Sequence, residues 1–224
     1  MSEIASVARS GTQDRILAQA ETLFMVHGYE ATSLRLITNG AGVNLAAVNY
    51  HFGSKEELFQ SVLTRRLDPL NIDRLKLLDT LEAKYAPKSV PLPEILSAMF
   101  LPALQLGRDQ SRGGKNFLRL LGRAYVDPAP FIRNLLSEQY APMIARFKAA
   151  FGKALPHLSR DDLTMRLHFV MGAMAYTLAG TDALKLISTI NPEEPQDDSI
   201  LLRKLAPFLT AGLQAPATDS LALV

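Results

Sequence analysis

The sequence contains no cysteine and no tryptophan. The lack of cysteine excludes disulfides, thiolate metal sites and cysteine nucleophiles, and it is compatible with a reducing, cytoplasmic location. The 224 residues also show little excess of either charge, with a formal net charge of +2. Such a balance does not by itself indicate nucleic acid as a partner. With 48% hydrophobic residues, the chain has ample material for a folded core.

No hydrophobic run is long enough to indicate a membrane span. The most apolar segment, residues 167–187, is interrupted by Asp182 and Lys185, so its uncharged part is shorter than the roughly 18 residues that a span needs. We expect a buried or interface helix there. The first residues, MSEIASVARSGTQ, lack the apolar segment of a signal peptide. The sequence therefore predicts a protein without a membrane partner.

Helical spacing of apolar residues predominates, and no segment alternates like a strand, which predicts an all-α fold. A first helix is expected to begin at Thr12 and to end at Gly28. The apolar face of this helix recurs at intervals of three and four residues, and it comprises Ile16, Ala20, Leu23, Phe24 and His27.

Three further helices are expected soon after the first. Thr32 or Ser33 can cap a second helix, the letters GAGVN predict a tight turn, and Asn44 can cap a short third helix. The letters SKEE, which begin at Ser54, have the spacing of a capping box and predict a fourth helix.

Two short helices joined by a glycine turn and followed by a long helix form the layout of a helix-turn-helix. Val43 can fill the space between the two short helices, and the small residues 46–48 allow the second of them to approach base edges. Tyr50, His51 and Lys55 supply hydrogen-bond donors suited to phosphate oxygens. The pattern therefore favours a surface for nucleic acid.

His51 has other interpretations. A histidine beside aromatic residues is more often structural than a ligand, and the carboxylates that follow it, Glu56 and Glu57, are explained by helix capping. A catalytic pairing of serine with His51 would need a third orienting group and an oxyanion site, and the sequence indicates neither. We expect no metal, no cofactor and no enzymatic activity.

Charge is balanced within residues 1–66. The basic residues are Arg9, Arg15, Arg35, Lys55, Arg65 and Arg66, and the acidic residues are Glu3, Asp14, Glu21, Glu30, Glu56 and Glu57. A DNA-binding face must then depend on where the charges lie, and each subunit would neutralise few phosphates. This predicts modest binding by a monomer and a need for a dimer that reads two half-sites.

Residues 12–60 resemble the TetR family of bacterial transcriptional repressors. The resemblance rests on the Leu23–Phe24 pair, the Gly28–Tyr29 step, Thr32–Ser33, the Ala41–Gly42–Val43 turn and the letters HFGSKEEL, in order and at the usual spacings. It implies an N-terminal helix-turn-helix domain followed by a helical ligand-binding and dimerisation domain. The letters VNLAAVNYHFGSKEEL are also similar to a branch that includes fatty-acid-responsive regulators.

The resemblance implies a DNA-binding surface residue by residue. Thr32 and Ser33 correspond to phosphate contacts at the start of the second helix, and His51 and Lys55 correspond to contacts with the DNA backbone. The recognition helix contributes Asn44, Leu45, Ala46, Ala47, Asn49 and Tyr50. Asn49 stands where the family usually has tyrosine, and it can instead pair with an adenine edge. The two alanines offer only apolar contact to thymine methyl groups.

The expected domains are a flexible arm at residues 1–11, the helix-turn-helix domain at 12–66, the helical effector-binding and dimerisation domain at 67–214, and a flexible tail at 215–224. In the second domain, loops are expected at 87–93, 107–114 and 191–199, before a final helix at 200–213. Pro69 is expected to bend or divide the fourth helix.

Apolar residues at helical spacings in the second domain can line a cavity for a small apolar effector. The candidates are Phe100, Leu104, Phe117, Leu121, Tyr125, Phe147 and Phe169. The same residues can equally be plain core, and the sequence leaves both possibilities open. Arg119 and Arg123 can anchor a carboxylate or can belong to a solvated basic stripe.

Small residues between 172 and 180 would let a partner helix approach closely. Together with Leu201, Leu205, Phe208 and Leu209 they predict a four-helix homodimer seam. We expect a sequence-specific DNA-binding regulator, usually a repressor, that a small apolar ligand such as a fatty acid or acyl compound releases from a double-stranded operator. The alternative is a helical ligand-binding or scaffolding protein without DNA function, because the recognition helix has few base-reading side chains.

Overall fold

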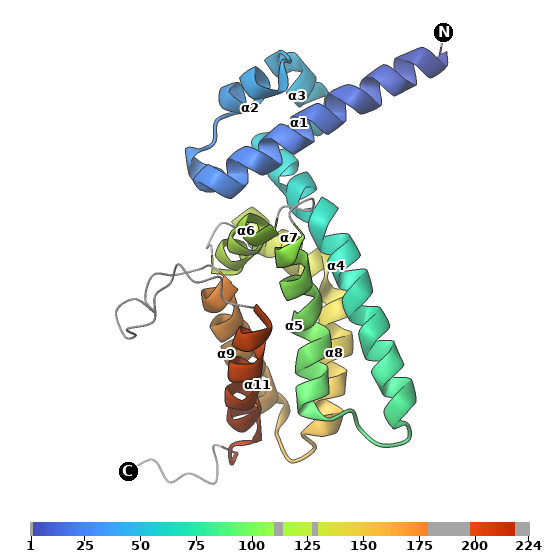
Figure 1. Ribbon diagram of the computed structural model, residues 1–224, viewed down its shortest axis with the longest axis vertical. Coiled ribbons are helices and arrows are strands. Elements are labelled where there is room, and N and C mark those ends of the chain that lie inside the picture. Colours follow the sequence, from blue (N-terminus) through green and yellow to red (C-terminus); the bar gives the residue numbers. More distant parts are fainter. Residues whose placement is uncertain (1, 110–113, 127–129, 179–197, 218–224) are drawn as a thin grey trace. The chain divides into compact units, whose positions relative to one another are not determined.

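The computed structural model describes residues 2–109, 114–126, 130–178 and 198–217. All regular secondary structure in these ranges is helical, which confirms the all-α prediction (Figure 1). The chain divides into two compact units. Unit 1 comprises Met1–Pro69 with Ala129–Ile132, and unit 2 comprises Leu70–Pro128 with Arg133–Val224. No helix in the described part of the chain is long and apolar enough to cross a membrane.

Unit 1 is built from the first helices of the chain. They are α1 (Ser2–Ala31), α2 (Leu34–Ala41), α3 (Leu45–Phe52) and the first part of α4 (Lys55–Tyr85). Helix α1 begins at Ser2, ten positions before the predicted start at Thr12, because no proline interrupts the intervening residues. Gly28 has a φ of 80° and a ψ of 177°, so it kinks the chain where the sequence predicted an end, and a last turn continues to Ala31.

The core of unit 1 is formed by α1, α2, α3 and the first part of α4. Ile16, Ala20 and Phe24 are fully buried on α1, as the apolar spacing predicted. His27, which was expected on the same face, is exposed, because the kink at Gly28 follows it directly. Fully buried residues from the other helices include Ile37, Val48, Leu58, Val62 and Leu63. Each buried side chain of this size stabilises the fold by about 1.5–3 kcal/mol.

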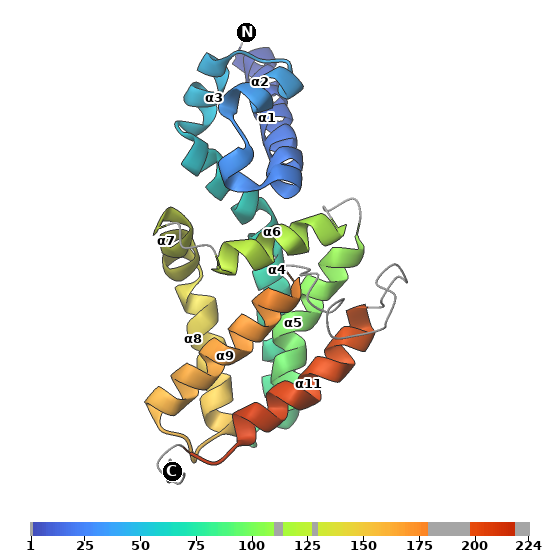
Figure 2. The same ribbon diagram turned by 90° about the vertical axis from the view of Figure 1, so that its left-hand side faces the viewer.

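Unit 2 contains the rest of α4 and the helices that follow it. These are α5 (Leu92–Arg108), α6 (Gly114–Val126), α7 (Pro130–Gln139, whose first residues belong to unit 1), α8 (Ala141–Ala154), α9 (Arg160–Leu178) and α11 (Asp198–Gln214). Helix α5 packs against α6, α8 and α11, while α9 packs against α6, α8 and α11 (Figure 2). The predicted loop at 191–199 lies almost wholly outside the described residues, and α11 closely matches the predicted final helix.

The sequence predicted a bend or a division of α4 at Pro69, and the helix is not divided there. Five residues later, Arg74 is 4% exposed and joins α4 to α5: its Nε donates to the Met99 carbonyl oxygen at 2.7 Å. Its Nη1 donates to Oδ1 of Asn71 at 2.9 Å. These bonds supply partners for a guanidinium that would be costly to bury alone.

Candidate nucleic-acid interface

The turn between α2 and α3 depends on a glycine. Gly42 has a φ of 64° and a ψ of 40°, a left-handed conformation in which a Cβ is strained. Its N–H donates to the carbonyl oxygen of Asn39, and the N–H of Val43 donates to the carbonyl oxygen of Thr38. These two hydrogen bonds form a Schellman motif. The turn therefore fixes the angle at which α3 leaves α2.

Both short helices begin at the caps that the sequence predicted. The Oγ of Ser33 accepts a hydrogen bond from the N–H of Leu36 at 3.1 Å, and the Oδ1 of Asn44 accepts one from Ala47 at 2.9 Å. Both capping residues have extended backbones. Because these side-chain oxygens satisfy first-turn N–H groups, they define where α2 and α3 start.

One side of α3 faces solvent, and we call its residues Leu45, Ala46, Asn49 and Tyr50 the α3 face. Leu45 is 45% exposed and Tyr50 is 68% exposed. The opposite side is anchored in the core of unit 1 by Val48 and Phe52. Ala47, also predicted on the interface, is half-buried beside this face. A helix with two alanines and one amide among its outer residues can lie close to a flat or grooved partner.

Basic and polar groups flank the α3 face. His51 is half-buried, and its ring packs edge-on against Tyr50 with 5.1 Å between the ring centroids. Ser54 starts α4, since its Oγ accepts a hydrogen bond from the N–H of Glu57 at 3.1 Å. Lys55, the first residue of α4, is half-buried, and its Nζ lies 4.2 Å from the centroid of the Tyr29 ring.

The sequence did not predict a role for Tyr29 at this interface, although the residue is part of the Gly28–Tyr29 step. Its ring lies in a cluster of aromatic residues, 5.1 Å from the ring of Phe59 and 6.0 Å from that of Phe24. Burial raises the pKa of the Tyr29 phenol, and the carboxylates of Glu56 and Glu30 raise it further. The phenol therefore stays neutral and supports Lys55 through its ring.

Thr32 occupies a different position from the other candidates. Its side chain is fully buried, and its Oγ1 donates to the Gly28 carbonyl oxygen at 2.7 Å. Ser33, in contrast, is exposed at the start of α2. The hydroxyl of Thr32 thus closes the turn between α1 and α2, while Ser33 lies on the surface.

A buried ion pair joins α1 to α4 within unit 1. Arg66 Nε lies 2.6 Å from Oε1 of Glu21, and the two side chains are 17% and 6% exposed. The pair fixes α1 against the helix that begins at Lys55. It also uses one of the few basic residues of this unit for structure.

The predicted effector residues divide into a buried group and an exposed one. Phe100, Leu104, Phe117, Leu121 and Phe147 are at most 3% exposed in unit 2, and Tyr125 is half-buried. Phe169 is 63% exposed and therefore does not join the buried group. The buried residues belong to the core of unit 2.

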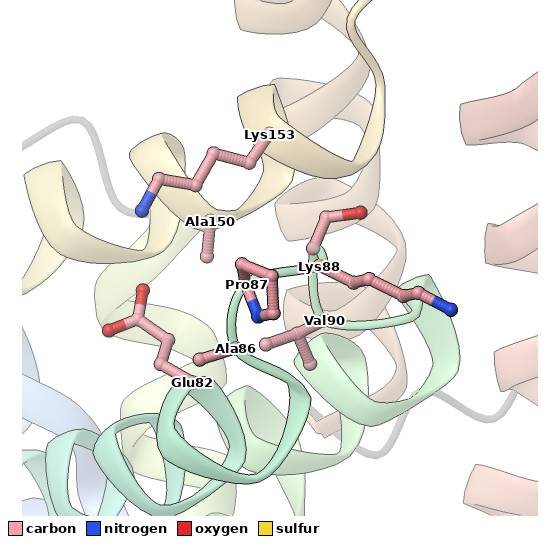
Figure 3. Close-up of a pocket in the computed structure, with 8 residues that line it drawn as sticks. Glu82, Ala86, Pro87, Lys88, Val90, Ala150 and Lys153 are labelled. Atoms are coloured by element: carbon pink, nitrogen blue, oxygen red, sulfur yellow. The ribbon is translucent and has the colours of Figure 1, made fainter.

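Unit 2 also has a surface hollow of about 400 Å³ between the end of α4, the loop that follows it and α8. It is lined by Glu82, Ala86, Pro87, Lys88, Ser89, Val90, Ala150 and Lys153 (Figure 3). The ammonium groups of Lys88 and Lys153 point away from each other in Figure 3. None of the predicted effector residues lines this hollow, and its exposed lysines make no common binding point.

Several exposed apolar residues and glycines lie on α9 and α11, and we call them the α9–α11 face. Its residues are Met165, Phe169, Gly172 and Tyr176 of α9 with Phe208 and Gly212 of α11. Phe169 and Phe208 are 63% and 70% exposed, and a Cβ added at either glycine would meet no atom within 4 Å. Of the predicted seam, Ala175 and Leu209 are buried instead, and Ala179 and Gly180 lie outside the described residues.

The sequence matches two family models, one for each unit. Residues 16–62 match the model described as bacterial regulatory proteins, tetR family, and residues 97–212 match the tetracyclin repressor-like C-terminal domain. The first match contains α2 and α3, and the second extends from within α5 into α11. Together they confirm the resemblance seen in the sequence.

Curated relatives share part of the sequence. The transcriptional regulator SrpR of Pseudomonas putida is 32% identical in an alignment of 96 residues that covers 38% of this chain and 45% of SrpR. The uncharacterized regulator TtgW of the same species is 32% identical in an alignment of 96 residues that covers 38% of this chain and 72% of TtgW. The repressor ComR of Escherichia coli is 41% identical over 56 residues, 25% of this chain and 27% of ComR. The similarity to SrpR therefore covers less than half of that protein.

Solved structures share the fold at low sequence identity. The fatty acid degradation regulator FadR of Bacillus halodurans has a TM-score of 0.57 at 16% identity, over 92% of this chain and 97% of FadR. The regulator PfmR of Thermus thermophilus has a TM-score of 0.57 at 20% identity, over 90% of this chain and 100% of PfmR. These likenesses show the fold alone.

Proposed function

The chain belongs to the TetR family of bacterial DNA-binding transcriptional regulators. We propose that it is a homodimeric repressor and that a small apolar molecule releases it from its operator. It would act in the cytoplasm on a double-stranded operator. The observation that carries the proposal is the α3 face, which is exposed on one side of a helix whose other side is anchored in the core.

In this proposal the α3 face enters the major groove. Asn49 offers an amide that can bond both the N6 and N7 positions of adenine, while Leu45 and Ala46 contact thymine methyl groups. Ser33, Tyr50 and His51 then contact the phosphate backbone together with Lys55. Thr32 acts indirectly, since its buried hydroxyl fixes the turn that places Ser33. Asn44 acts mainly as the cap that starts α3.

Dimerisation is proposed through the α9–α11 face. Large exposed apolar residues beside two open glycines suit a close helix-on-helix contact. We assign Phe169 to this contact and not to the effector cavity, because its side chain is exposed. A two-fold symmetric dimer would place two recognition helices about one helical turn of DNA apart, so the operator should be an inverted repeat.

The effector is proposed to be a fatty acid or acyl compound bound among Phe100, Leu104, Phe117, Leu121, Tyr125 and Phe147. The support is the apolar character of this group and the fold shared with FadR, which is described as a fatty acid degradation regulator. Native mass spectrometry of the purified protein tests whether an apolar molecule co-purifies. Dodecanoate should raise the melting temperature and weaken DNA binding; if it does neither, the fatty-acid assignment is wrong while the DNA-binding proposal stands.

The DNA-binding proposal is tested by selection from a random duplex library with the purified wild-type protein. We expect enrichment of an inverted repeat with half-sites spaced by whole helical turns. Failure to enrich any sequence, under conditions where the protein is folded and dimeric, would favour the alternative of a helical ligand-binding or scaffolding protein.

A further inference from the structure

The first turn of α7 belongs to unit 1, although the rest of this helix belongs to unit 2. Phe131, in that turn, has its ring centroid 4.9 Å from that of Tyr29 and 6.0 Å from that of Phe59. Phe59 in turn packs edge-on against Phe24 at 4.9 Å. We call these four residues the aromatic cluster. Phe131, which follows Phe59 by more than 70 positions in the sequence, thus completes the packing around Tyr29.

The Tyr29 ring also contacts the ammonium of Lys55. The ammonium of Lys55 lies 4.2 Å from the centroid of the Tyr29 ring, and it donates to the Glu30 carbonyl oxygen at 3.5 Å. A cation over an aromatic face is attracted by the ring quadrupole, and this attraction depends on the orientation of the ring. The orientation of the Tyr29 ring therefore decides where the ammonium of Lys55 is held.

Lys55 keeps its capacity for a further anion. In the part of the chain that the structure describes, no carboxylate lies within ion-pair distance of its Nζ. Neither an aromatic ring nor a carbonyl oxygen neutralises a positive charge, and an ammonium has three N–H donors. Lys55 can therefore bind a phosphate oxygen while it remains over the Tyr29 ring.

We propose that Phe131 is a positioning residue for DNA binding, which acts by fixing the Tyr29 ring that holds Lys55. This inference rests on the proposed function, because it assigns Lys55 to the DNA backbone. It gives the α7 turn a direct influence on DNA affinity without any contact between Phe131 and DNA. Loss of the Phe131 ring removes one of the three rings that pack against Tyr29, so the Tyr29 ring is less restrained and the ammonium of Lys55 is less well placed.

A double-mutant cycle tests the DNA-linked part of the inference. Phe131→Leu fills most of the space without a ring, and Lys55→Met removes the charge. The ligand is a duplex that the wild type selects from a random library. We expect Phe131→Leu to weaken binding of the dimer about tenfold. Each of the two subunits loses a positioning of Lys55 that is worth about as much as one cation–ring attraction. In the Lys55→Met background the same substitution should have almost no effect.

Two control variants separate positioning from stability. Phe131→Tyr keeps the ring and should bind DNA like the wild type. Ile132→Val removes a methylene from a side chain that is 1% exposed in the same turn, so it should lower the melting temperature but leave DNA affinity unchanged. An equal loss of affinity from Phe131→Leu with and without Lys55 would overturn the inference. No binding by the wild type would instead overturn the proposed function.

A measurement on the free protein tests the inference without DNA. The ring current of Tyr29 should shift the ε-CH₂ protons of Lys55 upfield in the NMR spectrum, and Phe131→Leu should move them toward the values of an exposed lysine. Lys84, whose Nζ lies 4.9 Å from the Tyr85 ring in unit 2, is the internal control and should not change. An unchanged Lys55 signal in folded Phe131→Leu protein would overturn the inference.

Discussion

At the scale of single residues, Asn49 and Lys55 are expected to contribute differently to DNA binding. The amide of Asn49 lies on the α3 face and can form a pair of hydrogen bonds that only one base edge satisfies. The ammonium of Lys55 is a point charge that attracts phosphate whatever the sequence. Asn49 should therefore contribute to the sequence specificity of DNA binding, and Lys55 should contribute to its salt dependence.

Asn49→Ala should weaken binding to the selected duplex by about 1–3 kcal/mol and relax the preference at one base position, because the bidentate amide contact is lost. Its salt dependence should remain that of the wild type. Fluorescence anisotropy with a set of single-base variants of the duplex measures both quantities. The matched variant Lys55→Met should weaken all duplexes alike and reduce the salt slope by about 1 per subunit. A uniform loss from Asn49→Ala would show that Asn49 does not read a base.

Asn44→Ala should destabilise the protein by about 0.5–2 kcal/mol, since the N–H of Ala47 loses its capping oxygen. Asn44→Ser should stay close to the wild type, because serine caps helices equally well. Urea unfolding followed by circular dichroism compares the three proteins. If serine costs as much as alanine, the role of Asn44 is not that of a cap.

The caps were predictable at this scale because capping is decided within four residues. Ser33, Asn44 and Ser54 all accept the hydrogen bonds that their spacing predicted. The role of Tyr29 beneath Lys55 was not predictable, because these residues lie on different helices and meet only in the folded unit. Phe131 carried no local signal either, since the rings of Tyr29 and Phe59 that it contacts are distant from it in the sequence.

At the scale of elements, α1 and α4 are held together by apolar packing and by one buried ion pair. Glu21 and Arg66 are 45 positions apart, and only 6% of the Glu21 side chain is exposed. A buried pair contributes less than its short distance suggests, because both charges lose their hydration. Removing one partner is costly, since the other charge then stays buried without compensation.

Glu21→Gln should therefore destabilise the protein by about 3 kcal/mol, near the lower end of the range for a broken buried pair. The matched variant is Asp79→Asn, which breaks one of the two contacts that Arg146 makes with α4 at an exposed site. It should cost less than about 1 kcal/mol. Chemical denaturation measures both values, and equal costs would contradict the structural role of the Glu21–Arg66 pair.

The elements themselves were largely predictable from periodicity, and their limits less so. The short helices α2 and α3 match their predicted positions, because glycine and the caps end and start them sharply. The start of α1 differs from prediction, and α4 is not divided at Pro69. In both cases the sequence signal was a single residue, and the neighbouring residues favour helix strongly enough to outweigh it.

At the scale of the whole molecule, the proposed dimer depends on the α9–α11 face. Phe208→Glu should convert the dimer to a monomer, because a carboxylate in a closely packed helix contact loses its hydration without a partner. Light scattering coupled to size-exclusion chromatography measures the mass. Ile144→Glu is the control, since Ile144 is 46% exposed on α8, a helix that is not part of this face. Loss of the dimer in the control alone would place the contact elsewhere.

The effector and the operator lie beyond what sequence or fold could determine. Five of the predicted effector residues are buried in unit 2, but burial is equally the property of a core residue. Few side chains of the α3 face can read bases directly, so the operator sequence does not follow from them. The sequence was enough to identify the family, because the helix-turn-helix is a local pattern. It was not enough to identify the effector, because the shape of an effector site depends on packing across several helices.

Binding of DNA by the α3 face and its flanking groups can be measured in a single titration. Wild-type protein and the double variant Tyr50→Ala with Lys55→Ala are titrated onto the selected duplex at several salt concentrations. The control is Tyr85→Ala with Lys84→Ala, a tyrosine–lysine pair of unit 2. We predict salt-sensitive binding by the wild type and the control, and loss of binding by the variant in unit 1. Equal binding by all three proteins would show that the α3 face and its flanking groups do not bind DNA.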